Sequence, residues 1–135
     1  MADAKGQLVR GWLSKALRDL AAAQRLAEGP EPFFDTAVYH CQQAAEKAVK
    51  AYLTWRDRRF DKTHDVRLLM ALAASLEPRL KVWLDAADRL TPYAIAFRYP
   101  GDVMEPSAED YGDAVAAADG ICRAILEVLP LTLHP

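Results

Sequence analysis

The sequence predicts an all-α fold, an antiparallel bundle of four to five helices of the up-down type. Apolar residues recur at steps of three and four positions along most of the chain, which is the period of a helix with one buried face. No segment alternates in the two-residue period of a strand. Proline and glycine separate the periodic segments by short intervals, so consecutive helices are expected to pack antiparallel.

The first two helices are predicted on either side of the breaker Gly29-Pro30-Glu31-Pro32. The earlier helix has an apolar stripe on the face opposite Lys15, Arg18 and Asp19. The members of that stripe are Leu13, Ala16, Leu17, Leu20 and Ala27. The later helix is expected over residues 33–56 and has a wider apolar face. That face consists of Phe34, Val38, Cys41, Ala45, Ala48, Val49, Tyr52 and Leu53.

Thr63 is predicted to cap a short third helix, which ends at Pro78 because the residue before a proline disfavours the helical region. The stripe of this helix is Leu68, Leu69, Leu72, Ala73 and Leu76, and a fourth stripe follows with Leu80, Trp83, Leu84, Ala87 and Leu90. Thr91-Pro92 has the pattern of an N-cap followed by proline at the first helical position. Either a short new segment or a kink is expected there.

The last helix is predicted to begin after Ser107, which forms a capping-box pattern with Asp110. A proline-bounded loop over residues 100–106 precedes it. Its stripe keeps the helical period for five turns until Pro130 stops it. The residues of the stripe are Tyr111, Ala114, Val115, Ala118, Ile121, Cys122, Ile125, Leu126 and Leu129.

The bulk composition limits the classes of function. A length of 135 residues with 52% hydrophobic residues predicts one domain over residues 1–135. The net charge of −2 argues against non-specific clamping of a polyanion, so any nucleic-acid contact must be local. No apolar run reaches the ~20 residues that span a bilayer, and no signal-peptide core is present, so a cytoplasmic protein without membrane contact is expected. Cys41 and Cys122 lack metal-binding companions; two buried free thiols, no metal and no cofactor are expected.

Polar side chains on the predicted second helix are the first candidates for a site. Gln42, Glu46 and Lys50 follow one another at four-residue steps, and Gln43 and Lys47 lie on a neighbouring strip. One interpretation is an exposed Glu46–Lys50 pair that supports the helix by about 0.2 to 0.5 kcal/mol. The other interpretation is a polar site shared with the segment around Arg98.

The loop over residues 56–65 is basic, with Trp55 and Phe60 interleaved, as in sites that hold a phosphate and stack a base. A solvated loop is the alternative, since Asp57, Asp61 and Asp65 dilute its charge. Two interpretations of His64 stay open, a general base and a residue that fixes the turn at the helix start.

Arg98-Tyr99-Pro100 closes the connection before the last helix. An arginine at such a place can fork onto a phosphate or carboxylate, with Tyr99 as a stacking face. It can equally bind the ends of neighbouring helices. The common catalytic motifs, namely the Gly-rich phosphate loop, Gly-x-Ser-x-Gly and His-Glu-x-x-His, do not occur in the sequence.

Four segments together resemble the HEPN family, the higher-eukaryote and prokaryote nucleotide-binding domain, in its small prokaryotic form. Residues 12–20 (WLSKALRDL) resemble its opening helix and residues 39–53 (YHCQQAAEKAVKAYL) its signature helix. Residues 63–65 resemble the start of its third helix, and residues 97–100 resemble its late arginine motif. The order and spacing match over about residues 8–129, which would be the core of the domain.

This resemblance implies a helical bundle that is commonly dimeric and often encoded beside a minimal nucleotidyltransferase as a toxin–antitoxin pair. It also implies a polar site near Gln43, Glu46, Lys50, His64 and Arg98, and we add Tyr99 as a ligand-binding candidate. The main hypothesis is therefore a non-catalytic subunit that faces a nucleotide or single-stranded RNA and pairs with itself and with a nucleotidyltransferase. A purely structural homodimer is a further alternative.

Some members of the family are metal-independent ribonucleases, which implies a ribonuclease toxin as the second hypothesis. That branch has a histidine four to six residues after its arginine. The chain departs from this pattern, because no histidine follows Arg98 through Glu105. Arg59 and His64 satisfy the spacing, but they lie in the loop after the signature helix. Arg98, His64 and Arg59 are the catalytic candidates under this hypothesis.

Overall fold

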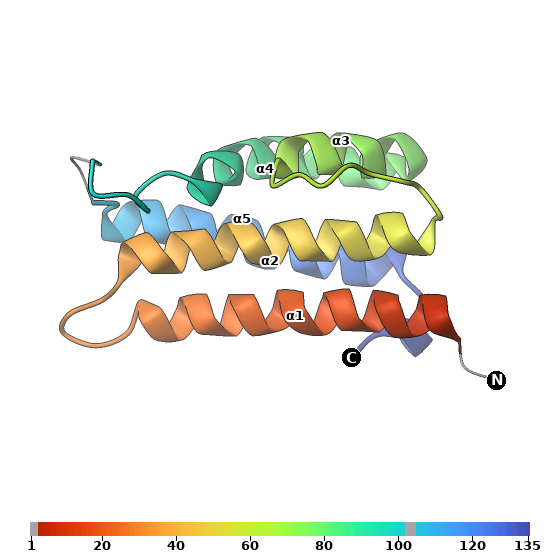
Figure 1. Ribbon diagram of the computed structural model, residues 1–135, viewed down its shortest axis with the longest axis horizontal. Helices are drawn as coiled ribbons and strands as arrows, with labels where there is room; N and C mark the ends of the chain where they lie inside the picture. The colour runs from red at the N-terminus through yellow and green to blue at the C-terminus, as the bar shows by residue number, and fades with distance from the viewer. Residues whose placement is uncertain (1–2, 102–104) are drawn as a thin grey trace.

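The computed structural model describes residues 3–101 and 105–135, and these residues form helices joined by turns, with no strand among them (Figure 1). The α-helices are α1 (Ala4–Leu26), α2 (Phe34–Trp55), α3 (Val66–Leu76), α4 (Leu84–Leu90) and α5 (Ala108–Val128). Short 3₁₀ segments occupy Pro78–Trp83, Thr91–Ala94 and Leu131–Leu133. The all-α prediction is confirmed. Part of the loop predicted after Arg98, residues 102–104, lies outside the described residues.

Helix α2 is the central element of the bundle (Figure 1). It packs antiparallel on α1, and it also contacts α3, α4 and α5. Helices α3 and α4 form a layer on the side of α2 opposite α1. Because 14 of its 22 residues are buried, α2 has almost no solvent-facing stripe, unlike an ordinary surface helix. Polar residues on such a helix must find partners inside the protein.

Alanines on α2 allow its neighbours to approach closely. The fully buried ones are Ala37, Ala44, Ala45, Ala48 and Ala51. Small side chains at helix contacts reduce the interaxial distance toward the lower end of the usual range of about 8 to 10 Å. The larger apolar residues of the predicted stripes, such as Leu13, Leu69 and Ile121, fill the space around this helix.

The start of α3 differs from the prediction. Asp65, not Thr63, is the N-cap, and its carboxylate accepts a hydrogen bond from the Leu68 amide at 3.0 Å. The Thr63 hydroxyl instead accepts from the Asp65 amide at 3.1 Å and orders the preceding turn. Both residues favour caps and turns, and the sequence pattern did not distinguish between two positions so close together.

The segment between α3 and α5 is also divided differently. The fourth stripe forms a 3₁₀ segment, Pro78–Trp83, followed by the short helix α4. Pro92 lies at the start of a separate 3₁₀ turn, so the expected short segment is present. Thr91 does not cap it. Its hydroxyl donates to the Ala87 carbonyl at 3.0 Å and accepts from the Arg67 amide at 3.1 Å, which ties α4 to α3.

Two helix ends position the later parts of the site. The capping box of α5 is confirmed, since Ser107 and Asp110 exchange side-chain to backbone hydrogen bonds of 3.0 and 2.9 Å. At the end of α2, the Arg58 amide bonds to the Leu53 carbonyl at 2.9 Å, and Asp57 adopts a φ of 56°. This is the Schellman arrangement that reverses a chain at a helix end. The following loop therefore runs back along α2 (Figure 1).

Candidate functional site

A buried polar cluster lies on α2 and consists of Gln42, Gln43, Glu46 and Lys50 together with His64. Lys50 Nζ lies 3.1 Å from Glu46 Oε2, and the two side chains are only 9% and 4% exposed. The interpretation of this pair as an exposed surface contact is therefore wrong. A buried ion pair contributes little net stability, but losing one partner leaves an uncompensated charge in a low-dielectric interior.

Side-chain amides complete the hydrogen bonding of the buried polar cluster. Gln42 Nε2 donates to the backbone carbonyl of His64 at 2.7 Å and lies 3.3 Å from Glu46 Oε1. Gln43 Nε2 donates to Gln42 Oε1 at 2.7 Å. Lys50 Nζ also lies 5.6 Å from the ring centroid of Trp12 on α1 and 5.8 Å from that of Phe60. These aromatic faces attract the ammonium group and exclude water from it.

His64 joins the buried polar cluster to the surface. Its Nδ1 lies 2.8 Å from Glu46 Oε1, while its side chain is 71% exposed. A carboxylate only accepts, so Nδ1 carries the proton and Nε2 is the nitrogen left for solvent or a ligand. The bond from Gln42 to the His64 backbone carbonyl holds the turn before α3 against α2, and the role of the His64 side chain in fixing this turn stays a prediction. Its role as a general base stays a prediction.

Arg98 reaches α2 by a sharp turn of the chain. Phe97, directly before it, has a φ of 68°, in the left-handed region that bulky residues rarely adopt. The Arg98 guanidinium lies over the ring of Tyr39 on α2, with Cζ 4.1 Å from the ring centroid. Its Nη1 donates to the Ala94 carbonyl at 3.2 Å. No other side-chain hydrogen bond from Arg98 to a described residue is present. The bond therefore joins Arg98 to its own turn, and not to a neighbouring helix.

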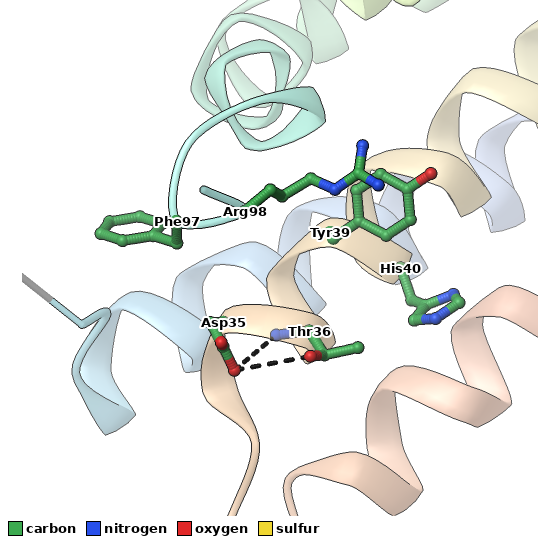
Figure 2. A pocket seen from close by; sticks show the side chains of 6 residues that line it. All are labelled: Asp35, Thr36, Tyr39, His40, Phe97 and Arg98. Carbon is green, nitrogen blue, oxygen red and sulfur yellow. Dashed lines mark hydrogen bonds between the residues drawn. The ribbon is translucent and has the colours of Figure 1, made fainter. Parts of the chain in front are cut away.

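Arg98 lines a pocket of about 280 Å³ (Figure 2). The residues that line this pocket, called the Arg98 pocket below, are Asp35, Thr36, Tyr39, His40, Phe97 and Arg98. His40 Nδ1 lies 2.8 Å from Oδ1 of Asp19 on α1. The second oxygen of Asp19 accepts from Lys47 Nζ at 2.6 Å. The carboxylate of Asp19 thus holds the His40 ring in one orientation.

Sequence reasoning did not identify Asp19, Tyr39 or His40 as site residues. Asp19 and His40 are 21 positions apart on different helices, so no local spacing marks them as a pair. The available signal was weak. Both residues fall within the segments that resemble the opening and signature helices of the HEPN family. The sequence pattern placed Asp19 on the face opposite the apolar stripe, which is wrong, because its side chain is only 12% exposed and pairs with His40 and Lys47 of α2.

The predicted site residues are brought together only in part. Gln43, Glu46, Lys50 and His64 join the buried polar cluster, whereas within residues 3–101 and 105–135 Arg98 makes no hydrogen bond to that cluster. Tyr39, Gln43, Glu46 and Lys50 share one face of α2 at helical spacing. At 1.5 Å per residue, Tyr39 and Glu46 are about 10 Å apart along the helix axis. The structure therefore contains two neighbouring polar centres on one face of α2.

Tyr99 and Arg59 lie outside these two centres. Tyr99 follows Arg98 and is 61% exposed. Arg59 is exposed and lines a second pocket of about 440 Å³, together with Phe60, Thr63 and others. His64 does not line that pocket. The spacing of Arg59 and His64 in the sequence is thus not accompanied by a shared pocket.

No group of three histidine, cysteine, aspartate or glutamate residues in residues 3–101 and 105–135 could hold a metal ion. No helix there has the length and apolar character needed to cross a membrane. Cys41 and Cys122 are free thiols, as expected, and burial raises the pKa of each to about 12.

The fold and the site define a class of protein, a small helical bundle whose central helix has a polar face inside the protein. A family model for the HEPN domain matches residues 9–129. The chain belongs to the HEPN family. A search of curated proteins finds no match.

Two solved structures are similar to the chain over most of its length. ST0689, described as an archaeal HEPN homologue, is 26% identical; the match covers 88% of this chain and 95% of that one, with a TM-score of 0.68. TT1696 from Thermus thermophilus is 28% identical; the match covers 90% of this chain and 98% of that one, with a TM-score of 0.71.

Proposed function

We propose that this HEPN protein is a non-catalytic binding subunit that presents a nucleotide- or RNA-facing site. We further propose that it acts as a homodimer beside a minimal nucleotidyltransferase, in a pair of the toxin–antitoxin type. The observation that supports the binding role most directly is the position of Arg98 over Tyr39 at a pocket.

The geometry of Arg98 suits an anionic ligand. A guanidinium has five N–H donors, and one nitrogen of Arg98 is used by the Ala94 carbonyl. The remaining donors can fork onto a phosphate, which an arginine binds with two parallel hydrogen bonds. The Tyr39 ring, whose centroid lies 4.1 Å from Cζ, helps to orient the planar guanidinium. Because the whole chain has a net charge of −2, the attraction for a phosphate has to come from such a local cation.

The size of the Arg98 pocket agrees with a small ligand or one unit of a longer one. Its volume of about 280 Å³ lies near the lower end of the range for ligand pockets, which is about 300 to 1,000 Å³. Tyr39 and Phe97 are among the residues that line it, and an aromatic face that the Arg98 guanidinium does not cover stacks a base without regard to sequence. A nucleotide supplies both an anion and a base.

The homodimer is supported by apolar side chains left at the surface. Several large hydrophobic residues are at least half exposed, namely Leu8, Phe33, Leu68, Val82, Ile95, Tyr99 and Leu131. Association of two copies of the chain would bury some of these side chains, and this removal of apolar surface from water favours a dimer. Sedimentation at micromolar concentration should show a species larger than the 15.0 kDa chain. A single 15.0 kDa species would contradict the homodimer.

The family resemblance supports the nucleotidyltransferase partner. Co-purification with the product of a short nucleotidyltransferase gene next to the gene for this chain would support the pair. Absence of such a gene, or of a complex between the two products, would leave the binding subunit without this partner.

A ribonuclease is the second candidate, favoured by the contact between Glu46 and His64. A buried carboxylate that fixes an exposed imidazole is the arrangement of a general base and its orienting group. A general base contributes roughly 10² to 10⁴-fold in rate, so its loss is easily measured. Cleavage of RNA by the wild type, abolished by His64→Ala or Arg98→Ala, would favour this candidate over the binding subunit.

The binding role is tested by titrating mononucleotides and a short single-stranded RNA into the wild type, Arg98→Ala and Arg123→Ala. Arg123 is the matched control, because it is an exposed arginine on α5 that pairs with Asp119. We expect Arg98→Ala to weaken binding by about 1.5 to 3 kcal/mol, the scale of a charge-assisted contact, with unchanged thermal stability. Arg123→Ala should bind as the wild type does.

Other results of this titration would contradict the proposal. A lower melting temperature of Arg98→Ala with unchanged binding would show that Arg98 ties its turn to α2 and does not hold a ligand. A wild type that neither binds nor cleaves RNA or nucleotides, even with its genomic neighbour, would leave only the structural homodimer.

A further inference from the structure

The Arg98 pocket has an unusual balance of hydrogen-bonding groups. Arg98 is the arginine that lines it, and Asp35, at the start of α2, adds a carboxylate to the lining of the same pocket (Figure 2). Lys47, also on α2, donates a hydrogen bond from Nζ to the Asp19 carboxylate at 2.6 Å. A ligand that fits must therefore bring one anionic group for Arg98 and hydrogen-bond donors for the acceptors around it.

His40 is one of these acceptors in its neutral form. Its Nδ1 lies 2.8 Å from the Asp19 carboxylate, which only accepts, so Nδ1 must carry the proton. Nε2 of the neutral ring then has a lone pair and no proton. Within the described residues, no other hydrogen bond of the His40 ring is present, and the ring lines the pocket. Asp19 thus acts on a ligand through His40, as a positioning residue.

Asp35 is the second acceptor. Its Oδ1 accepts from the Thr36 amide at 2.8 Å and lies 3.5 Å from the Thr36 hydroxyl. Figure 2 shows both contacts on the same oxygen of Asp35. The other carboxylate oxygen keeps its capacity to accept, since an ionised carboxylate has about four lone-pair sites. Carboxylates commonly accept from ribose hydroxyl groups in nucleotide sites.

We propose that the Arg98 pocket recognises the ribose–phosphate unit of a ribonucleotide, with the phosphate on Arg98 and ribose hydroxyls on His40 Nε2 and the Asp35 carboxylate. This rests on the proposed function and names its ligand more narrowly. The unit is the same in a free ribonucleoside monophosphate and in a strand of RNA. Deoxyribose and multiply charged phosphates fit less well.

The charges of the pocket explain the exclusion of a triphosphate. One pair of phosphate oxygens satisfies the guanidinium of Arg98, and any further negative charge shares the pocket with the Asp35 carboxylate. Negative charges within one pocket repel each other, and this repulsion is stronger there than in bulk water because the local dielectric constant is lower. A pocket of about 280 Å³ also offers little room beyond a single nucleotide unit.

The test compares four probes on the intact chain by calorimetry, namely adenosine, adenosine 5′-monophosphate, its 2′,3′-dideoxy analogue and adenosine 5′-triphosphate. We expect the wild type to bind the monophosphate about two- to tenfold more tightly than the dideoxy analogue, which is the effect of losing hydrogen bonds to the sugar. It should bind the triphosphate no more tightly than the monophosphate. Arg98→Ala should remove the advantage of the monophosphate over adenosine.

His40→Phe keeps a ring of similar size and removes both nitrogens, so it should bind the monophosphate and the dideoxy analogue equally. Asp19→Ala is the second variant, because it keeps the imidazole and removes the oxygen that accepts from Nδ1 and fixes the tautomer. In the neutral ring of His40, nitrogen-15 spectra should show a protonated Nδ1 and an unprotonated Nε2 in the wild type, a shift of Nε2 with the monophosphate, and a mixed tautomer in Asp19→Ala. Arg123→Ala should match the wild type in every comparison.

Equal binding of the monophosphate and the dideoxy analogue by the wild type, or a sugar preference that survives in His40→Phe, would overturn the ribose–phosphate assignment while the nucleotide-binding function stands. Tighter binding of the triphosphate would have the same consequence. Failure of all probes, including a short RNA and a DNA of the same sequence, would overturn both proposals. Tighter binding of the RNA than of the monophosphate would support the assignment and identify a strand as the source of the unit.

Discussion

Glu46 and His64 are joined by a contact of 2.8 Å between a carboxylate that is almost fully buried and an imidazole that is mostly exposed. Glu46 belongs to the middle of α2, whereas His64 ends the loop that runs back along this helix. The same carboxylate pairs with Lys50. It therefore connects an internal cation to the surface of the protein, and its removal has consequences for folding.

Replacing Glu46 by alanine should destabilise the fold by about 3 kcal/mol, because it leaves the Lys50 ammonium buried without its counter-charge. Trp12 and Phe60 offset a part of this cost through their ring faces. The measurement is the free energy of unfolding by urea. The double variant with Lys50→Met should recover most of the loss, since both charges are then absent.

The exposed pair Asp119–Arg123 on α5 provides the control for this variant. Asp119→Ala removes an ion pair at the same i,i+4 spacing in solvent, and it should change stability by about 0.5 kcal/mol or less. If Glu46→Ala and Asp119→Ala have equal effects, the buried pair contributes no more than a surface pair does.

Gly120 on α5 packs against the ring of Trp83. A Cβ at position 120 would overlap the ring atoms Cζ3 and Cη2 of Trp83, whereas a Cβ at Gly112 on the same helix meets open space. Gly112→Ala should therefore stabilise the protein by about 0.5 to 1 kcal/mol, the usual gain of alanine over glycine within a helix. Gly120→Ala should be less stable than Gly112→Ala by about 1 to 3 kcal/mol, the cost of overpacking.

Thermal or urea unfolding of the two glycine variants measures this difference directly. Tryptophan fluorescence gives an independent readout, since only Gly120→Ala should change the emission of Trp83. Equal stabilisation by both substitutions would mean that the ring moves aside without cost and that the close packing of α5 on the Pro78–Trp83 segment is not needed.

Burial raises the pKa of the Cys41 and Cys122 thiols to about 12, well above the ordinary value of about 8.5. The folded state therefore favours the protonated thiols. This contribution is fully present below about pH 8.5 and is lost as the pH rises from there towards 12, because the unfolded chain releases these protons first. The free energy of unfolding should fall over this interval.

The double variant Cys41→Ala with Cys122→Ala should show a flatter alkaline slope than the wild type. A part of the slope should remain, because burial also raises the pKa of Tyr93 and Tyr111. In the native wild type at pH 8, both thiols should react slowly with a disulfide reagent and become reactive in denaturant. Rapid reaction in the native state would contradict their burial.

The helical architecture could be predicted from the periodicity of the sequence, because the spacing of apolar residues within each segment shows which face of that helix is buried. The stripes that begin at Leu13 and Phe34 lie within α1 and α2, except for Ala27, which is the C-cap of α1. Ser107 and Asp110 form the capping box that their spacing indicates. Groups of polar side chains on one face of a single helix could also be predicted from the sequence. Gln42, Glu46 and Lys50 are one such group, since four-residue steps place side chains on one face.

Tertiary packing decided everything that depends on segments distant in the sequence. Whether Glu46 and Lys50 face solvent depends on the coverage of α2 by Trp12 and Phe60, which no local pattern records. The placement of Arg98 on Tyr39 depends on a turn at Phe97 with a backbone angle that sequence preferences disfavour.

The pairing of Asp19 with His40 shows the same limit most clearly. It joins α1 to α2 across 21 positions and places a second polar residue beside Arg98. A helix stripe specifies which side chains turn inward, but the partner of each polar group is set by how whole helices pack against one another. For this reason the sequence determined the fold and the signature helix, and only the tertiary structure separated one predicted site into two centres.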